Sequence, residues 1–440
     1  MHGGVHDERF PSSSTMPIMP NLVLLLAQIV VILLAARLSG RLMRRLGQPQ
    51  VVGEMVAGIA LGPSLFGAVA PRTWATLFPP ASLGFLNTLS QLGLILYMFL
   101  VGLELDTRSL ASRGRMALAI SWSSIAAPFA LGVLVAAWLF RSLAPAGVHF
   151  TGFALFLGAA MSVTAFPVLA RILEERQLTR SPLGSLAIAC AAVDDVSAWL
   201  ILAVVVSIAR SGESMSYLET FGGTVVYVIV MLTAGAALLG RFGRRVAESG
   251  SIAQGQLAAV IIVVFVSAGI TEVLGIHALF GAFLAGAVMP RDERFRQALA
   301  SRFEDLLVAF LLPLFFAFTG LRTQLGLVAA DGAQLLALGV ILLVAVAGKF
   351  GGTAIAARLT GMSWRAGALL GSLMNTRGLM ELVILNIGLD IGVISPTLFA
   401  MMVFMAIGTT LMTTPVVVRL ARGLPDAQPV HATAAALVHG

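Results

Sequence analysis

The sequence predicts an all-α polytopic membrane protein of about thirteen transmembrane helices. Of its 440 residues, 58% are hydrophobic and only 11% are charged, whereas soluble domains carry about a quarter charged residues. Apolar runs of about 20 residues recur along nearly the whole chain, which is the length a helix needs to cross a hydrocarbon core of about 30 Å. None of these runs alternates polar and apolar residues as barrel strands do, so a membrane β-barrel is not expected.

The apolar runs and the arginines between them set the expected topology. One set of alternate loops carries 21 basic residues and the other carries five. By the positive-inside rule, the N-terminus is expected outside and the C-terminus in the cytoplasm. The expected location is the inner (plasma) membrane of a bacterium. The predicted spans are 17–36, 50–67, 83–103, 116–140, 150–170, 183–206, 221–240, 255–271, 273–289, 305–321, 333–356, 366–388 and 393–418.

Several functional classes are disfavoured by composition. A single cysteine, Cys190, excludes an intramolecular disulfide. The net charge of +7 does not indicate a nucleic-acid partner, because most arginines lie between spans rather than in one patch. Residues 1–16 are expected to form a short external tail rather than a cleaved signal peptide. Residues 423–440 are expected to be a short cytoplasmic tail without a nucleotide-binding regulatory domain, and no cofactor is expected.

Two triplets of spans repeat along the chain. Spans four to six and spans eleven to thirteen start at matching offsets, and seven spans separate each pair, so the triplets must cross the membrane in opposite directions. Inverted-topology transporters are built in this way. Span spacing alone also arises by chance in apolar sequence, so the helix interruptions described next carry more weight.

The second span of each triplet contains residues that interrupt a helix. In "SVTAFPVLA", Pro167 lacks an N–H group and Thr164 can cap freed backbone. In "SLMNTRGLM", Asn375, Thr376 and Gly378 are poor helix-interior residues at mid-membrane depth. Broken helices at matched positions predict an ion site at the bilayer midplane. The alternative is a simple proline kink in one span and a continuous helix in the other.

Ionisable side chains at membrane depth identify the candidate site. Each such residue costs about 2.5 to 3.5 kcal/mol at a helix centre, so it is expected to face a partner or a water-filled cavity. Neighbouring helical residues point about 100° apart, so one of the adjacent acids can pair with the lysine while the other exchanges a cation for a proton. The alternative is a structural ion pair beside one capped acid. These residues are Asp194 and Asp195 in span six, Lys349 in span eleven, and Arg377 and Glu381 in span twelve.

Other charged residues receive less weight. Arg377 stays charged at any relevant pH, so it is expected to brace the broken helix and Glu381 rather than to carry protons. Glu54 lies near a span end and is expected at the membrane interface, as are Glu104, Asp106 and Arg108. His277 is expected to be a packing residue.

Seven ordered motifs resemble one transporter family. They are "GEMVAGIALGPSLFG", "LYMFLVGLELD", "SVTAFPVLARIL", "AAVDDVSAW", "GIHALFGAFLAG", "LLPLFFAFTGLRT" and "MNTRGLMELVILNIGL". Together they are similar to the monovalent cation:proton antiporters of the second family, which includes NapA-type sodium/proton antiporters, the Kef systems and the plant CHX exchangers. The resemblance covers nearly the whole chain.

The resemblance implies an NhaA/NapA-like inverted repeat with two crossed broken helices. It implies a sodium/proton exchanger domain over 17–422, with core helices about 116–206 and 333–418 and dimerisation or scaffold helices about 17–103 and 221–321, in a homodimer surrounded by membrane lipid. By motif position, Asp195 matches the aspartate that carries the ion and the proton. Asp194 matches the variable residue before it, and Lys349 matches the lysine that pairs with that residue in NapA-like members. Electrogenic exchange is therefore favoured.

The expected function is secondary antiport of Na⁺ or K⁺ against H⁺, without enzymatic activity. Asp194, Asp195 and Thr164 are expected to bind the transported ion and proton, with Lys349 as proton-coupled partner. Pro167, Asn375, Arg377 and Glu381 are expected to support the broken helices. A Kef-type potassium efflux system and a cation channel are the alternatives. An intramembrane aspartyl protease is disfavoured, because its two acids must face each other from separate helices.

Overall fold

The computed structural model describes residues 22–104, 114–179, 181–210, 217–241, 252–290, 292–329 and 331–427. All regular secondary structure in these residues is helical. The predicted tail 1–16, Asp106, Arg108 and most of the predicted tail 423–440 lie outside the described residues.

The helices follow in chain order through the two halves of the sequence. The first half contains α1 (Leu22–Arg45), α2 (Gln50–Leu61), α3 (Phe66–Val69), α4 (Pro71–Leu77), α5 (Pro80–Leu103), α7 (Gly114–Leu143), α8 (Phe150–Ser162), α9 (Phe166–Glu175), α10 (Pro182–Arg210) and α11 (Tyr217–Val230). The second half contains α13 (Gln254–Val273), α14 (Ala278–Ala287), α15 (Glu293–Leu306), α16 (Leu312–Arg322), α17 (Leu325–Ala329), α18 (Gly332–Val346), α19 (Gly352–Leu359), α20 (Trp364–Met374), α21 (Leu379–Asp390) and α22 (Pro396–Ala421).

Each of the thirteen predicted spans overlaps a helix of the structure. Eleven helices in the described residues are long and apolar enough to cross a membrane. The bent pair of α20 and α21 adds one more span, and α14, with ten residues, is a shorter apolar helix. The number thirteen is therefore approximate, and the all-helical polytopic class is confirmed.

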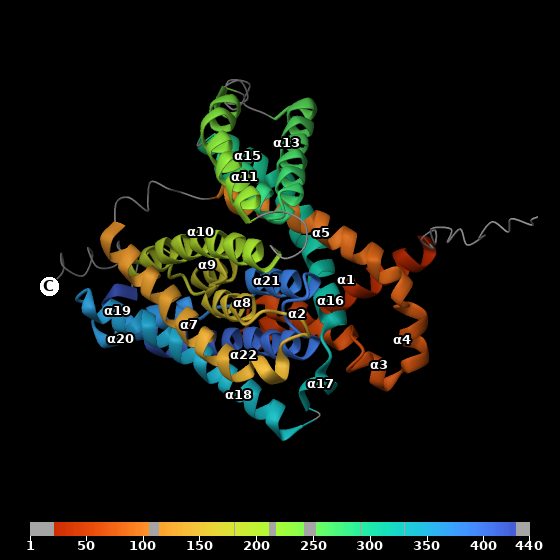
Figure 1. Cartoon of the computed structure of the whole chain (residues 1–440). Helices are drawn as coiled ribbons and strands as arrows, with labels where there is room; N and C mark the ends of the chain where they lie inside the picture. The colour runs from red at the N-terminus through yellow and green to blue at the C-terminus, as the bar shows by residue number, and fades with distance from the viewer. Residues whose placement is uncertain are drawn as a thin grey trace, which may run out of the picture.

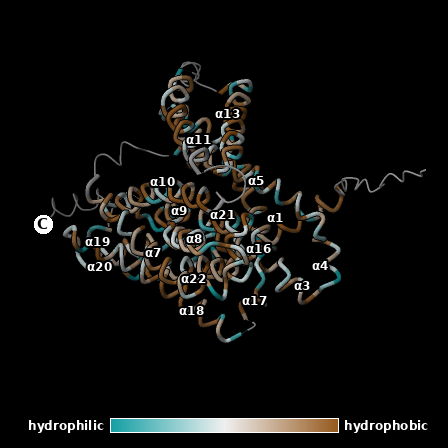
Figure 2. Tube along the Cα trace, viewed as in Figure 1, coloured by the Kyte–Doolittle hydropathy of each residue, from teal (hydrophilic) through white to brown (hydrophobic). Residues whose placement is uncertain are grey.

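The outer surface of the bundle is apolar, the reverse of a soluble protein. Leu34 on α1, Trp138 on α7 and Ile262 on α13 are at least half exposed. Figure 2 shows hydrophobic residues along almost the whole length of the helices, with hydrophilic residues mainly at their ends and in turns. A helical bundle with this surface satisfies its backbone internally and presents side chains to lipid.

The two predicted triplets correspond to α7–α10 and α18–α22. Helix α7 packs against α8 and α19, α10 packs against α8 and α20, and α18 packs against α22, so the triplets interleave into one body. They lie together in Figure 1, whereas α3 and α4 lie on the other side of the molecule and the pair α11 and α13 projects from it. Gly132 of α7 and Gly158 of α8 permit close packing here, because a Cβ on Gly132 would lie 2.8 Å from the Gly158 Cα.

A second set of contacts joins several of the remaining helices. Helix α2 packs against α1 and α16, and α14 packs against α5 and α13. The two sets meet where α16 contacts α21 and α2 contacts α22. We call this boundary the seam, and it positions the candidate site. The assignment of the two sets as a dimerisation scaffold and a moving core stays a prediction.

Candidate ion-binding site

The two broken helices cross at their breaks. Helix α8 ends at Ser162 and α9 begins at Phe166, whereas α20 and α21 are bent by 46° across a four-residue break. At the crossing, the Ala165 backbone N–H donates to the Thr376 carbonyl at 2.9 Å. The Thr164 hydroxyl lies 3.1 Å from the Met374 carbonyl. The predicted crossed broken helices are therefore confirmed, and each break satisfies part of the other's freed backbone.

Arg377 braces this crossing. Its guanidinium donates to the carbonyls of Ala160 at 3.1 Å and Met161 at 2.6 Å, in the last turn of α8. The same group pairs with Glu381 at 3.1 Å, and both side chains are fully buried. The Thr410 hydroxyl of α22 lies 3.0 Å from the Arg377 backbone N–H and 2.7 Å from its carbonyl. A cation at a helix C-terminus offsets the unpaired carbonyls there, so this geometry fits the predicted bracing role.

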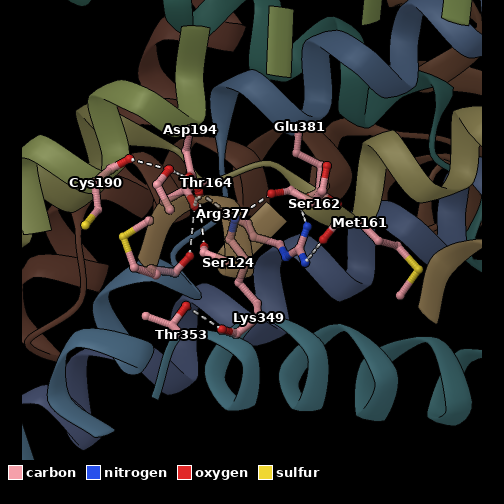
Figure 3. Close-up of polar contacts among 12 residues, drawn as sticks. Ser124, Met161, Ser162, Thr164, Cys190, Asp194, Lys349, Thr353, Arg377 and Glu381 are labelled. Carbon is pink, nitrogen blue, oxygen red and sulfur yellow. Dashed lines mark hydrogen bonds and ion pairs between the residues drawn. The ribbon is translucent and has the colours of Figure 1, made fainter. Parts of the chain in front are cut away.

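Asp194 is surrounded by hydrogen-bond donors (Figure 3). One carboxylate oxygen accepts from the Ser121 hydroxyl of α7. The other accepts from Thr164 at 2.7 Å, from Ser124 at 3.2 Å and from the Lys349 ammonium at 2.7 Å. The Asp194 and Lys349 side chains have no solvent exposure. Such an ion pair is stable in a dry interior only when further hydrogen bonds support it, and three hydroxyls supply that support.

Lys349 lies in a π-helical turn between α18 and α19, Ala347–Gly351. Its ammonium reaches the Ser162 carbonyl at the end of α8 as well as Asp194. The Thr353 hydroxyl bonds back to the Lys349 carbonyl at 2.7 Å. Because a π-helical turn changes the direction of the following side chains, it is frequent at functional sites. The lysine thus joins α10 of one triplet to α18 and α19 of the other.

Asp195 has a different environment from its neighbour. Its side chain is only 3% exposed. Within the described residues, neither of its carboxylate oxygens has a hydrogen-bond partner. The Phe166 backbone amide, in the first turn of α9, lies nearby without meeting hydrogen-bond geometry. A buried carboxylate without donors is costly, so this group is suited to a ligand that is not part of the chain.

An acidic cavity of about 500 Å³ reaches the breaks from one end of the bundle. Phe166, Pro167 and Leu379, at the starts of α9 and α21, line it together with residues of α2, α5 and α16. One arginine, Arg171, also lines it. The carboxylates that line the cavity belong to Glu54, Glu104, Glu174, Glu175 and Glu304. Such a concentration of acids attracts cations to the entrance of a site.

At the other end of the seam the cavity is small. The cavity there holds only about 20 Å³ and is lined by residues of α5, α14, α16 and α21. Arg322 of α16 pairs with Asp390 of α21 at 2.7 Å and donates to Asn386 at 3.1 Å. The Asn386 amide in turn donates to Thr319 at 2.8 Å. Polar bonds across the seam therefore join α16 to α21 beside this small cavity, whereas the acidic end has a large one.

Several of these residues were not identified from the sequence. Ser121 and Ser124 are ordinary hydroxyl residues in the sequence, although their spacing of three places both on one helix face. Glu54, expected at the membrane interface, lies near the start of α2, where it is buried against protein, accepts from Gln50 at 2.9 Å and lines the acidic cavity. Of the support residues, Asn375 is buried at the break with its side-chain oxygen unpartnered among the described residues.

Comparison with known proteins identifies the family. A family profile described as "Sodium/hydrogen exchanger, transmembrane" matches residues 29–422. The chain belongs to the sodium/hydrogen exchanger family. As a member of this family it is an integral membrane protein of a transporter class, and the predicted resemblance is confirmed.

Similar proteins span several kingdoms. The chain is 44% identical over 401 residues to the Na(+)/H(+) antiporter NhaS4 of Synechocystis sp., which covers 91% of this chain and 97% of the relative. It is 41% identical over 408 residues to the cation/H(+) antiporter 17 of Arabidopsis thaliana, covering 91% of this chain and 49% of that protein. It is 33% identical over 420 residues to the K(+)/H(+) antiporter 1 of Saccharomyces cerevisiae, covering 94% of this chain and 47% of that protein. This chain thus spans about half the length of the plant and yeast relatives.

A solved structure has the same fold. The sodium proton antiporter MjNhaP1 from Methanocaldococcus jannaschii superposes with a TM-score of 0.59 at 15% identity, covering 93% of this chain and 99% of the other.

Proposed function

We propose that this protein exchanges Na⁺ or K⁺ against H⁺ by alternating access, with the cation and the proton competing for Asp195. One observation carries the proposal: Asp195 is buried at the crossing of the broken helices, without a hydrogen-bond donor in the described residues, near an acid-lined cavity. A cation or a proton each neutralises this carboxylate, and neutralisation lowers the cost of its burial. Competition for one carboxylate couples the two fluxes, and the names of the relatives agree with such exchange.

Asp194 has a supporting role in this scheme. Its oxygens already accept from three hydroxyls and Lys349, so it positions the lysine and the helix breaks beside Asp195. Thr164 belongs to the same set of donors. If the lysine also releases a proton when the cation binds, two protons exchange for one cation. Each cycle then moves one net charge, worth about 2.3 kcal/mol per 100 mV of membrane potential.

The two ends of the seam support alternating access. The acidic end opens to a cavity of about 500 Å³, whereas the other end retains only about 20 Å³ beside the Arg322–Asp390 pair. Movement of the core helices against the scaffold helices would exchange the two ends. We place the protein as a homodimer in a bacterial inner membrane, with the N-terminus outside and the C-terminus inside. A channel is disfavoured because it requires both ends to be open together.

Transport assays test the proposal directly. Proteoliposomes with an imposed pH gradient are titrated with Na⁺, K⁺ and Li⁺, for the parent and for Asp195→Asn. The parent should release protons saturably with one or more of these cations, and Asp195→Asn should release none. Glu175→Gln, which removes an exposed carboxylate from the same cavity, is the matched control and should retain exchange. Parental exchange by Asp195→Asn would refute the carrier role, and unsaturable flux without proton movement would indicate a channel.

A further inference from the structure

A basic cavity of about 470 Å³ opens where the turn between α1 and α2 meets the ends of α9 and α22. Gly47 and Gln48 of that turn line one side. Arg176 at the end of α9, and Arg419 and Arg422 at the end of α22, also line the cavity. No carboxylate of the described residues lines this cavity. Three guanidinium groups therefore share one pocket without an acid to neutralise them.

The arginines of α22 are not needed to cap their own helix. Arg365 of α20 donates from Nε to the Leu420 carbonyl at 3.0 Å and also donates to the Arg422 carbonyl. These bonds satisfy carbonyls at the C-terminal end of α22, which Arg419 or Arg422 would otherwise hydrogen-bond. Within the described residues, the guanidinium groups of Arg419 and Arg422 have no acceptor or carboxylate partner. Both remain available to bind an external anion.

A buried hydroxyl without a partner belongs to a residue that lines the cavity. Thr414 is 4% exposed and lines the pocket, yet its hydroxyl has no partner within the described residues. Arg176 is already oriented, because its guanidinium donates to the Gly47 carbonyl at 2.9 Å. Gln48 is fixed through its amide, which donates to the Leu411 carbonyl at 3.2 Å. A buried hydroxyl without a partner is uncommon in a native structure and indicates a missing ligand or solvent.

We propose that this pocket binds a phosphate group, from an anionic lipid headgroup or from a soluble phosphate. Guanidinium groups match phosphate oxygens with paired, charge-assisted hydrogen bonds. Basic pockets between membrane helices are suited to lipid headgroups for the same reason. The bound group joins the α1–α2 turn to α9 and α22, so it links helices from both sides of the seam and stabilises them in this arrangement.

Thermal unfolding of the full chain tests the site without measuring transport, so its outcome is independent of the proposed antiport. In one arm, protein in neutral detergent is titrated with inorganic phosphate at constant ionic strength. In the other, protein in phosphatidylcholine vesicles is compared with protein in vesicles that also contain phosphatidylglycerol. The parent should gain stability saturably in at least one arm. A gain with phosphate alone identifies a soluble anion, and a gain with phosphatidylglycerol alone identifies a lipid.

Matched variants separate this pocket from general surface charge. The double variant Arg419→Gln/Arg422→Gln should weaken the apparent affinity about tenfold or more, because each lost charge-assisted bond contributes substantially. Thr414→Val should weaken it less. The control Arg44→Gln/Arg45→Gln removes the same charge from exposed positions at the end of α1 and should bind like the parent. If the double variant does not fold, Arg419→Gln alone gives the comparison. The proposal would be overturned if the parent gained no saturable thermal stability in either arm. It would also be overturned if the pocket variant and the control bound the phosphate group with equal affinity.

Discussion

Replacing the two adjacent aspartates one at a time should change stability in opposite directions. In Asp194→Asn, the amide oxygen can keep the hydroxyl donors Ser124 and Thr164, but Lys349 loses its counter-charge. Removing one partner of a fully buried ion pair costs about 3–5 kcal/mol. We therefore expect the free energy of unfolding of this variant to fall by about that amount.

Asp195→Asn should stabilise the fold while abolishing transport. The carboxylate that it replaces is buried and has no donor in the described residues. An unpartnered buried amide costs about 1–3 kcal/mol, whereas an unpartnered buried charge costs several kcal/mol. The difference predicts a gain of at least about 1 kcal/mol when the parent carboxylate is ionised and no cation is bound.

Reversible unfolding in mixed micelles with increasing Tris dodecyl sulfate, a denaturant without an alkali cation, measures both changes. The assay is run in a buffer without Na⁺ or K⁺, since a bound cation would stabilise the parent. The expected order of stability is Asp195→Asn, then the parent, then Asp194→Asn. If Asp195→Asn is the less stable of the two variants, then Asp195 has a structural partner and the division of roles between the two acids is wrong.

Two further predictions concern the ends of the seam. Arg322→Gln removes the ion pair with Asp390. The two side chains of this pair are 21% and 38% exposed, so the pair contributes at most about 1 kcal/mol. Its loss should shift the equilibrium between the narrow and the opened state of this end by at most about fivefold. In a Cys190→Ser background, Arg322→Gln should accelerate labelling of Gln91→Cys by a membrane-impermeant maleimide by up to that factor. Arg171→Gln, at the opposite end of the seam, is the control and should not accelerate it. An unchanged labelling rate in Arg322→Gln would show that the pair with Asp390 does not help to close this end. At the acidic end, burial and then repulsion from Glu304 raise the pKa of Glu104, whereas Arg296 opposes the shift. A carboxyl whose pKa is raised by folding stabilises the folded state in acid and loses that contribution as pH rises through the folded pKa. Glu104→Gln should therefore raise the unfolding temperature at alkaline pH, with the difference from the parent shrinking in acid. A difference independent of pH would contradict the assignment.

Much of the fold is determined locally and could be predicted from the sequence. Apolar runs of spanning length define the helices, because each membrane helix must satisfy its own backbone. The breaks follow from single residues, since Pro167 cannot donate and Asn375 and Gly378 favour non-helical backbone. Asp194, Asp195 and Lys349 identified the region of the site, because a charged residue at membrane depth costs free energy unless it has a partner or a cavity.

Which of the two acids contacts Lys349 depended on the tertiary structure. Residue spacing shows that Asp194 and Asp195 point in different directions, but not which of them meets Lys349; only the family resemblance implied the pairing that the structure contains. Helix rotation is fixed by packing, here by the approach of α7 with Ser121 and Ser124 and by the π-helical turn at Lys349. These contacts join segments separated by at least 70 residues.

The two cavities show the same division between local and tertiary information. Glu54, Glu104 and Glu304 line one cavity, and Arg176, Arg419 and Arg422 line the other, although each set comes from separate parts of the chain. The sequence determined that the protein is a helical membrane bundle with charges at mid-depth, because hydrophobicity and backbone satisfaction act within each helix. Only the tertiary structure decided which charges face each other and which face a cavity, because that depends on how whole helices pack.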